Sequence, residues 1–143
     1  MQKSVRAQVI DWRAAHVAVA AAAARAEALG VKVNVAVVDS GGNLAGFLRM
    51  PGAFLPSIDI AIDKAWTAAG FGFPTIDAPA ILAGLPENVR AGLAGRPRVT
   101  FFGGGVPIRD DGALIGGIGV SGGSDEQDHD CALAGIAALE TAA

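Results

Sequence analysis

A glycine-rich stretch in the last third of the chain limits the possible folds more than any other feature. Five of the eight residues from Gly116 to Gly123 are glycine, and Ser124 and Gln127 follow with the spacing of a capping box at a helix start. The pattern predicts an apolar strand that ends in glycines and leads directly into a helix. At such a junction several backbone N–H groups and the positive end of the helix dipole point to one place, where a small anionic group can bind.

Apolar periodicity and turn-forming residues predict the other elements. The expected helices cover residues 8–29 and 57–71 and begin again at Ser124, and the expected strands cover residues 33–38, 44–48, 99–102, 106–109 and 113–120. Strands joined by tight Asp-, Gly- and Asn-rich turns pair antiparallel. We therefore expect an α+β fold, in which residues 1–143 form one domain with a five-stranded antiparallel sheet and helices packed on it.

Charge and composition exclude several classes of partner. A formal net charge of −3 provides no basic surface for nucleic acid or for an anionic membrane. The alanine-rich stretch 14–29 contains charged residues and is too short to span a membrane. The one cysteine, Cys131, cannot form an internal disulfide and suits a reducing compartment, so we expect a cytoplasmic protein. Only 17% of the residues are charged and 52% are hydrophobic, which favours a homo-oligomer that covers apolar surface.

The first expected helix has two apolar stripes. One consists of Ile10, Val17, Ala21, Ala24 and Ala28, and the other of Val9, Trp12, His16, Ala20 and Ala23. One stripe suits the sheet, and the second suits a partner subunit or a ligand. His16 in the second stripe is either a packed interface histidine or an imidazole that contacts a ligand or ligates a haem iron.

Further side chains with acid–base potential lie in the last helix and in the second. His129 lies one turn into the last helix, and Asp125 four residues earlier can orient its ring. In the second helix Asp59 and Asp63 are four residues apart and Lys64 follows directly, and this group forms either a solvated face or an acid/base pair that lines a cleft. The residues expected to contact a ligand at the glycine junction are Ser121, Gly122, Gly123, Ser124 and Gln127. The chain has no zinc-ligand spacing and no Gly-x-Ser-x-Gly nucleophile motif.

Four segments in order carry a family resemblance. They are VAVVDSGGNL at 35–44, SIDIAIDKAWTA at 57–68, GGGVPI at 103–108 and IGVSGGSDEQD at 118–128. Together they resemble the GlcG/HbpS-type haem-binding family, which includes the C-terminal domain of PduO-type proteins. The resemblance implies a profilin-like fold, usually assembled into dimers or octamers, and haem as the cofactor.

The resemblance also suggests roles for single residues. A histidine in the first helix is the best match to an iron ligand, and that residue is His16. The nearest cationic candidates for the haem propionates are Arg49, Lys64 and Arg109. Where many relatives have an acid after the Gln-Asp pair, this chain has His129, which keeps an enzymatic function open.

Three functions follow from these observations. The first is a small-molecule binding protein for haem or a related tetrapyrrole, with His16 on the iron and no other cofactor. The second is a small cofactor-independent lyase or isomerase of catabolism that acts on a small carboxylate or aromatic catabolite. In that enzyme His129, or alternatively His16, moves a proton, Asp63 and Lys64 are further candidates, and the amides of residues 121–124 hold the substrate's anion. The third is an oligomeric assembly module that uses the apolar second stripe of the first helix.

Overall fold

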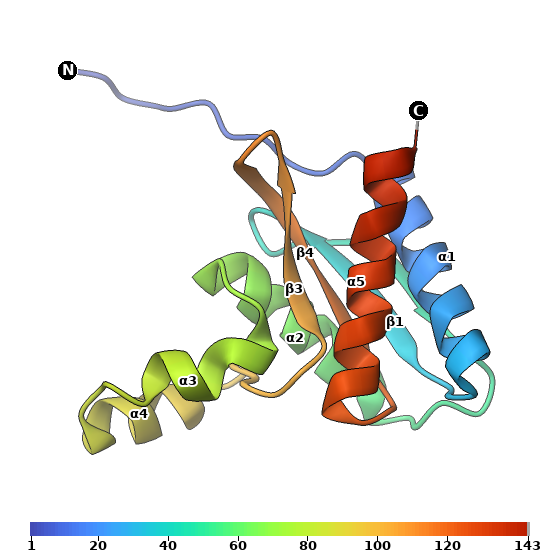
Figure 1. The fold of residues 1–143 in the computed structure, drawn as a ribbon. Helices are drawn as coiled ribbons and strands as arrows, with labels where there is room; N and C mark the ends of the chain where they lie inside the picture. Colours follow the sequence, from blue (N-terminus) through green and yellow to red (C-terminus); the bar gives the residue numbers. More distant parts are fainter. Residues whose placement is uncertain (143) are drawn as a thin grey trace.

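The computed structural model describes residues 1–142, and Figure 1 shows their arrangement. The helical elements are α1 (Trp12–Leu29), α2 (Ser57–Phe71), the short 3-10 turn η1 (Thr75–Asp77), α3 (Ala78–Leu82), α4 (Glu87–Ala94) and α5 (Asp125–Thr141). The strands are β1 (Asn34–Asp39), β2 (Leu44–Arg49), β3 (Gly105–Asp110) and β4 (Ala113–Ser121). The strands form one antiparallel sheet in the order β2-β1-β4-β3. The expected α+β class is confirmed, but the sheet within the described residues has four strands and not five.

The sequence predicts a fifth strand at residues 99–102, and this prediction is wrong. The backbone N–H of Thr100 donates to Thr67 Oγ1 at 3.1 Å, and Thr75 Oγ1 donates to the carbonyl oxygen of Phe102 at 2.6 Å. Because threonine hydroxyls bond these backbone groups, they do not require a neighbouring strand. Arg98, with a φ of 72°, also turns the chain just before this segment.

The first helix begins four residues later than the sequence predicts. Asp11 is its N-cap, and the Asp11 carboxylate accepts a hydrogen bond from the backbone N–H of Arg13 at 2.8 Å. Just before the cap, the N–H of Ile10 donates to the carbonyl oxygen of Ile115 in β4 at 3.0 Å. This bond holds the chain against the sheet, so the helix cannot extend further toward the N-terminus.

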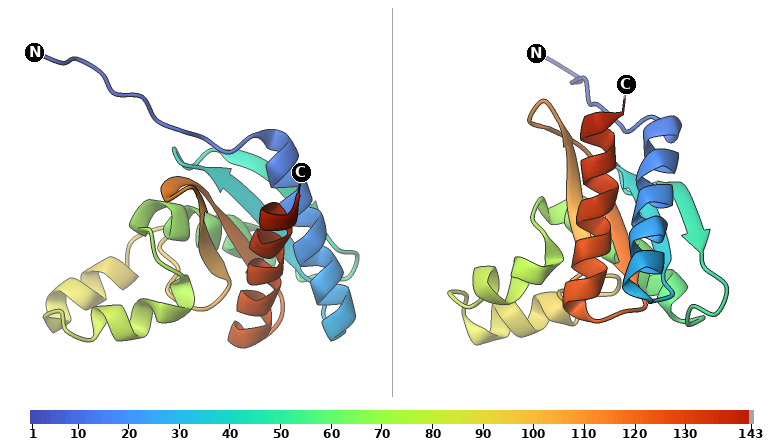
Figure 2. Two further views of the ribbon diagram at one scale, coloured as in Figure 1. Left: turned by 45° about the horizontal axis from the view of Figure 1, so that its top comes forward. Right: turned by 45° about the vertical axis from the view of Figure 1, so that its right-hand side comes forward.

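Helices cover both faces of the sheet. Figure 2 shows α1 and α5 side by side over one face, where Val35 and Val37 of β1 join the larger buried cluster. Ala36 and Val38 point to the other face and pack with the alanines of α2. This alternation follows the two-residue period of a strand, and it gives the protein a core on each side of the sheet.

The glycines of β4 allow α2 to lie very close to the sheet. A Cβ atom at Gly119 would lie 2.5 Å from the backbone nitrogen of Ala65 and would also overlap the carbonyl oxygen of Ala61. A Cβ atom at Gly117 would lie 3.0 Å from the backbone nitrogen of Ala69. Much of the glycine run therefore serves helix–sheet packing, for which only glycine leaves enough room.

Residues 75–98 connect α2 to β3 and form an arm that consists of η1, α3, α4 and the residues between them. The arm projects away from the sheet in Figure 1. No helix within the described residues combines the length and apolarity that crossing a membrane requires.

Candidate functional site

The residues that the sequence marks as functional lie in separate parts of the structure. His16 is exposed on the outer side of α1, beside β2. Lys64 and the segment 121–128 meet where α2, the end of β4 and the start of α5 converge. Asp63 belongs to neither group, because its carboxylate pairs with Arg98 at the base of the arm.

His16 borders a hollow between α1 and β2 with a volume of about 200 Å³. The hollow is lined by Trp12, His16 and Val19 of α1 and by Ala45, Gly46 and Phe47 of β2. Gly46 contributes to its shape, because a Cβ there would contact Ala15 and Val19 at 3.5 Å, so the strand lies close under the helix. Except for the imidazole, the side chains around the hollow are apolar or aromatic.

A second hollow of about 510 Å³ continues along the same helix and strand. Its lining residues are Ala20, Ala23, Ala24, Glu27, Lys32, Leu48, Arg49, Met50 and Pro51. The three alanines follow His16 by four, seven and eight residues, so they lie on its side of α1 and extend roughly 12 Å from it. We call the residues of the two hollows the α1–β2 face.

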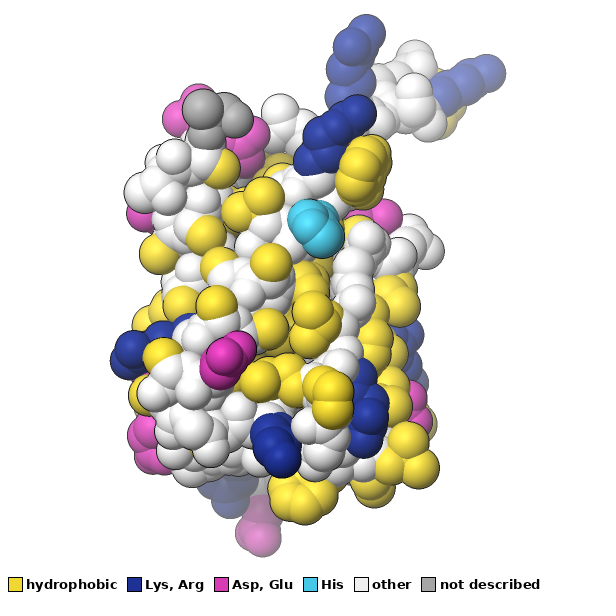
Figure 3. Space-filling view, turned by 90° about the vertical axis from the view of Figure 1, so that its right-hand side faces the viewer, with side chains coloured by type: hydrophobic (Ala, Val, Ile, Leu, Met, Phe, Trp, Pro, Cys, Tyr) yellow, Lys and Arg dark blue, Asp and Glu magenta, His cyan; other side chains and the backbone are white. Residues whose placement is uncertain are grey.

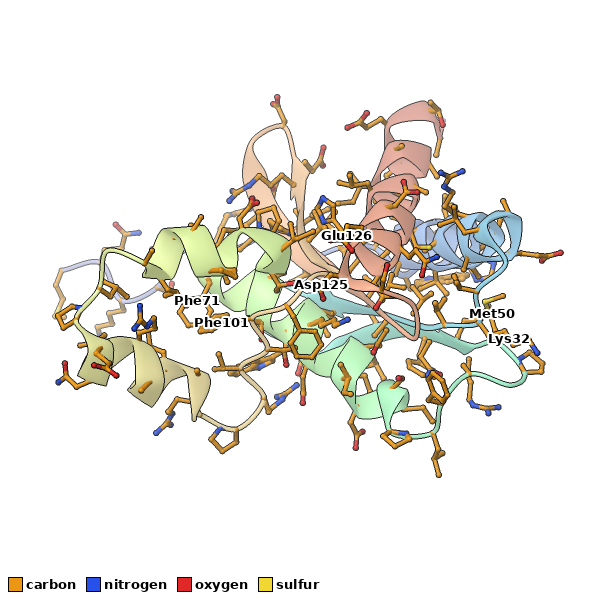
Figure 4. The ribbon with its side chains drawn as sticks, turned by 60° about the horizontal axis from the view of Figure 1, so that its bottom comes forward. Lys32, Met50, Phe71, Phe101, Asp125 and Glu126 are labelled. Carbon is orange, nitrogen blue, oxygen red and sulfur yellow. The ribbon has the colours of Figure 1, made fainter. Side chains whose placement is uncertain are left out.

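Figure 3 shows this side of the molecule, with hydrophobic side chains gathered between a histidine and several Lys and Arg side chains. Figure 4 shows the cationic end, where Lys32 lies beside Met50. The Arg49 guanidinium donates to the carbonyl oxygen of Ala53 at 2.8 Å, which fixes it at this end of β2. The α1–β2 face therefore combines an imidazole, an apolar surface, two cationic side chains and the carboxylate of Glu27.

A buried ion pair lies at the glycine junction. Lys64 Nζ is 3.1 Å from Asp128 Oδ2 and donates to the carbonyl oxygen of Val120 at 2.9 Å, and the side chains of the pair are 1% and 3% exposed. The ring of Phe102 covers the ammonium at 4.8 Å. A Cβ at Gly104 would approach Nζ to 2.9 Å, so the glycine-rich loop before β3 closes over the amine.

Burial dominates the electrostatics of this pair. Burial lowers the pKa of Lys64 from its ordinary value of 10.5, and the attraction of the Asp128 carboxylate opposes that shift. Burial likewise raises the pKa of Asp128 from 3.8, opposed by the Lys64 ammonium and by hydrogen bonds from the Gly123 and Gly122 amides. In both groups the cost of removing a charge from water exceeds the gain from pairing.

The backbone amides that the sequence assigns to a substrate anion already have acceptors. The N–H of Gly123 donates to Asp128 Oδ1 at 2.8 Å, and the N–H of Ser124 donates to Gln127 Oε1 at 2.9 Å. Ser124 Oγ accepts from the N–H of Gln127 in return, so the predicted capping box is confirmed. An anion at this junction would have to replace side chains of α5 itself.

The remaining acid–base candidates are not brought together. Asp63 Oδ1 lies 3.1 Å from Arg98 Nε, and the Arg98 guanidinium stacks over Trp66 at 4.5 Å. The Nδ1 atom of His129 is buried without a hydrogen-bond partner in the described structure. A catalytic role for Asp63, Lys64 or His129 stays a prediction. Within residues 1–142 no three His, Cys, Asp or Glu side chains converge to hold a metal ion.

Two features of these sites were missed in the sequence. Asp128 gives no local signal as the partner of Lys64, because the two residues are 64 positions apart. Lys32 was also not predicted from the sequence as a residue of the α1–β2 face. Its position directly before an apolar strand was the available signal, because such a residue lies at the end of the sheet. Of the three cations proposed for propionates, only Arg49 lies on this face. Lys64 is buried in its ion pair, and Arg109 donates to the carbonyl oxygen of Gly72.

The architecture defines a small α+β protein with an antiparallel sheet between helices and a candidate ligand face on its first helix. Sequence comparison assigns its family: the chain belongs to the family described as haem degrading protein HbpS-like, whose profile matches residues 10–137. The resemblance found in the four sequence segments is thereby confirmed.

Curated relatives include two PduO corrinoid adenosyltransferases. The Salmonella typhimurium protein is 42% identical over 125 residues, and the Citrobacter freundii protein is 37% identical over 139 residues. These matches cover 83% and 93% of this chain but only 35% and 40% of the relatives, so the chain spans less than half of their length. An uncharacterised 15.0 kDa protein of Citrobacter freundii is 38% identical, with 90% of this chain and 91% of that protein covered.

Solved structures with the same fold also have substantial sequence identity. Klebsiella pneumoniae protein ORFY superposes with a TM-score of 0.90 at 34% identity, covering 100% of this chain and 99% of that one. A PduOC–haem complex superposes with a TM-score of 0.81 at 39% identity, covering 91% and 94%. A double mutant of Streptomyces reticuli HbpS superposes with a TM-score of 0.87 at 36% identity, covering 97% and 92%.

Proposed function

We propose that this chain binds haem or a related tetrapyrrole on the α1–β2 face, with the imidazole of His16 as an axial ligand of the iron. The observation that carries the proposal is the exposed His16 side chain beside two successive, mainly apolar hollows, of which the farther one is lined by Lys32 and Arg49 together with Glu27. Neutral imidazole is a common axial ligand of haem iron. The bound haem would supply redox-active iron, and the chain's residues would bind and orient it.

The shape and polarity of the α1–β2 face match a tetrapyrrole. A porphyrin is flat and apolar over most of its area, and the small side chains of Ala20, Ala23 and Ala24 provide a correspondingly smooth surface. The propionates lie on one edge of the ring and need cations. Arg49 is three residues beyond Gly46 on β2, roughly 10 Å along the strand. If His16 held the iron, Lys32 and Arg49 would be the cations of this face available to the propionates.

The comparisons support the same ligand class. The PduOC–haem complex shares the fold at 39% identity, and the matching family is described by haem degradation. The corrinoid adenosyltransferase activity in the name of the PduO relatives is not part of this proposal, because the chain spans 35–40% of those proteins.

Titration with ferric haem, followed at the Soret band, tests the proposal. The wild-type chain is expected to give a saturable band at low micromolar concentration. His16→Ala is expected to shift the Soret maximum and weaken binding, because the axial imidazole is lost. His129→Ala is the matched control, since it removes the chain's other imidazole, and it is expected to leave the spectrum unchanged.

A second pair of variants tests the orientation of the ring. Lys32→Glu and Arg49→Glu place a carboxylate beside the expected propionates, so each is expected to weaken haem binding several-fold with little change in the Soret maximum. Absence of a saturable wild-type band would refute the proposal. A His16→Ala spectrum identical to wild type would refute the assignment of the iron ligand.

A further inference from the structure

Apart from the extended N-terminal residues 1–9, the outer part of the projecting arm packs least against its own chain. From residue 83 to residue 98 every residue is exposed except the half-buried Leu93. Helix α4 has no buried residue, and both views of Figure 2 show it beyond the body of the protein. The arm therefore contributes little to the core of a single copy.

An exposed helix as short as α4 needs packing from outside. It has eight residues, and isolated helices shorter than roughly 12–15 residues are only marginally stable in water. Gly92 in its middle weakens the helix, because glycine has a much lower helix propensity than alanine, and Pro86 at the N-cap provides no side-chain hydrogen bond. Because no other element within residues 1–142 buries α4, a second molecule is a further source of stabilisation for it.

The base of the arm, in contrast, is firmly held. The carbonyl oxygen of Arg98 accepts a hydrogen bond from Thr67 Oγ1 at 3.1 Å, and the Arg98 side chain pairs with Asp63. Phe71 and Phe101 lie together where the arm leaves the body (Figure 4), with ring centroids 5.6 Å apart. An arm fixed at its base and bare along its length loses little entropy on docking, which favours a binding element.

The exposed length of the arm is apolar and cationic. Ile81, Leu85 and Val89 are 49%, 38% and 41% exposed. Arg90 and Arg96 form no ion pair with the described residues. Beyond Asp77 near the base of the arm, Glu87 is its only acidic residue. The arm therefore suits an apolar hollow with an acidic rim.

The chain has such a hollow at the other end of its sheet. It has a volume of about 540 Å³ and lies between α1, α5 and the β3–β4 hairpin, and its apolar lining includes Val17, Ile108, Ile115, Ile136 and Leu139. Asp110, Asp111 and Glu140 stand on its rim without an ion-pair partner among the described residues. Of the two arginines in the lining, Arg13 pairs with Asp11, whereas Arg109 donates only to carbonyl oxygens and keeps its charge. The three carboxylates still outnumber this guanidinium, so the hollow has a net negative charge.

We propose that the arm of one copy docks into this acid-rimmed hollow of a second copy of the same chain. The balance of charges favours this hollow over the α1–β2 face. The hollow has three carboxylates and two arginines, whereas the α1–β2 face has Lys32 and Arg49 against the one carboxylate of Glu27. If two copies exchange arms reciprocally, the contact closes a two-fold dimer, and a one-way contact instead builds a ring. The proposal is independent of haem binding, because the two surfaces share no residue with the α1–β2 face.

Charge reversal on each surface tests the pairing in solution. One variant carries Arg90→Glu and Arg96→Glu on the arm, and the other carries Asp110→Arg and Glu140→Arg on the hollow. All four positions are exposed, so the substitutions leave the core intact and both variants are expected to fold with the wild-type circular dichroism spectrum. Loss of the partner is expected to lower their melting temperature. By light scattering at tens of micromolar, wild type is expected at a multiple of 14.3 kDa and each variant at a lower mass.

Mixing the two variants is the decisive measurement. In the mixture the acidic arm of one variant meets the basic hollow of the other, and the unaltered arm and hollow also match, so the wild-type mass is expected to return. A monomeric wild-type chain, or single variants that keep the wild-type mass, would overturn the proposal. A mixture that stays dissociated would overturn the assignment of the hollow as the arm's partner.

Discussion

Removing the ammonium of Lys64 tests how the two helical layers are joined. In Lys64→Met the carboxylate of Asp128 stays buried but loses its ion pair, and the carbonyl oxygen of Val120 loses its donor. Breaking a buried pair in this way typically costs about 3–5 kcal/mol, because the remaining charge is left uncompensated. For a chain of this length that corresponds to a melting temperature lower by roughly 10–20 °C.

The double variant distinguishes an uncompensated charge from lost packing. Lys64→Met combined with Asp128→Asn removes both charges, while the amide oxygen at position 128 can still accept the hydrogen bond from Gly123. Since burial dominates both pKa shifts, we expect the double variant to be more stable than Lys64→Met alone. Lys32→Met is the control for the loss of a lysine, and at that exposed position the change should stay within about 0.5 kcal/mol.

The pH dependence of Lys64→Met follows from the remaining carboxylate. Without Lys64, the pKa of Asp128 rises further above 3.8, since the ammonium was the strongest influence opposing burial. A raised folded-state pKa makes the folded state bind more protons, so the variant's stability falls as pH rises from about 4 toward neutrality. Urea denaturation of wild type and variants from acidic to neutral pH measures this. A cost for Lys64→Met below about 1 kcal/mol, or a double variant less stable than the single one, would refute the reasoning.

Three further substitutions and reactions test the packing. Gly119→Ala is expected to lower the free energy of unfolding by several kcal/mol or to prevent folding, because its Cβ would overlap the carbonyl oxygen of Ala61 in α2. Gly70→Ala is the control, because a Cβ at Gly70 would meet no atom within 4 Å, and it is expected to raise the free energy of unfolding by about 0.5–1 kcal/mol. Both are measured by thermal melting, and equal effects would contradict the close helix–sheet contact. Thr75→Val removes one hydrogen bond donated by its hydroxyl and one accepted from a backbone N–H, so urea denaturation should show a loss of about 1–3 kcal/mol. Burial raises the pKa of Cys131 to about 11, so the thiol is protonated at pH 8. An aromatic disulfide reagent at that pH should therefore modify Cys131 only after denaturation. Rapid reaction of the native protein would show that the thiol is accessible.

Local patterns in the sequence predicted local structure well. Ser124 and Gln127 form the expected capping box because both partners lie within one helical turn. The fifth strand was predicted wrongly at residues 99–102 because β-branched residues there are typical of a strand. In the structure, hydroxyl groups of Thr67 and Thr75 instead form hydrogen bonds with the backbone of this segment. Those bonds join residues about 30 positions apart, and no local propensity reports them.

For the candidate sites too, the sequence predicted features set by neighbouring residues better than features set by tertiary contacts. The apolar periodicity of the first helix predicted that one of its two stripes faces the sheet, and this is wrong. The buried residues of α1 are Ala15, Ala18, Val19, Ala22 and Ala26, which belong to neither stripe, whereas Trp12 and His16 of the second stripe are exposed. The sequence pattern of the glycine junction indicated free amides, but it could not show that Asp128 and Gln127 fold back to accept their hydrogen bonds. That competition depends on how α5 sits on the loop, which is a tertiary property.

Comparing Lys64→Met with His16→Ala in haem titrations separates the two candidate ligand sites. His16 is exposed, so its loss is expected to change stability by less than about 0.5 kcal/mol while removing the proposed axial ligand. Lys64→Met is expected to do the opposite, because Lys64 lies at the glycine junction and not on the α1–β2 face. Measured well below its melting temperature, Lys64→Met should therefore retain the wild-type Soret maximum and affinity. If it instead lost haem while His16→Ala kept it, the ligand would belong at the glycine junction, and the α1–β2 face would have to be abandoned as the binding site.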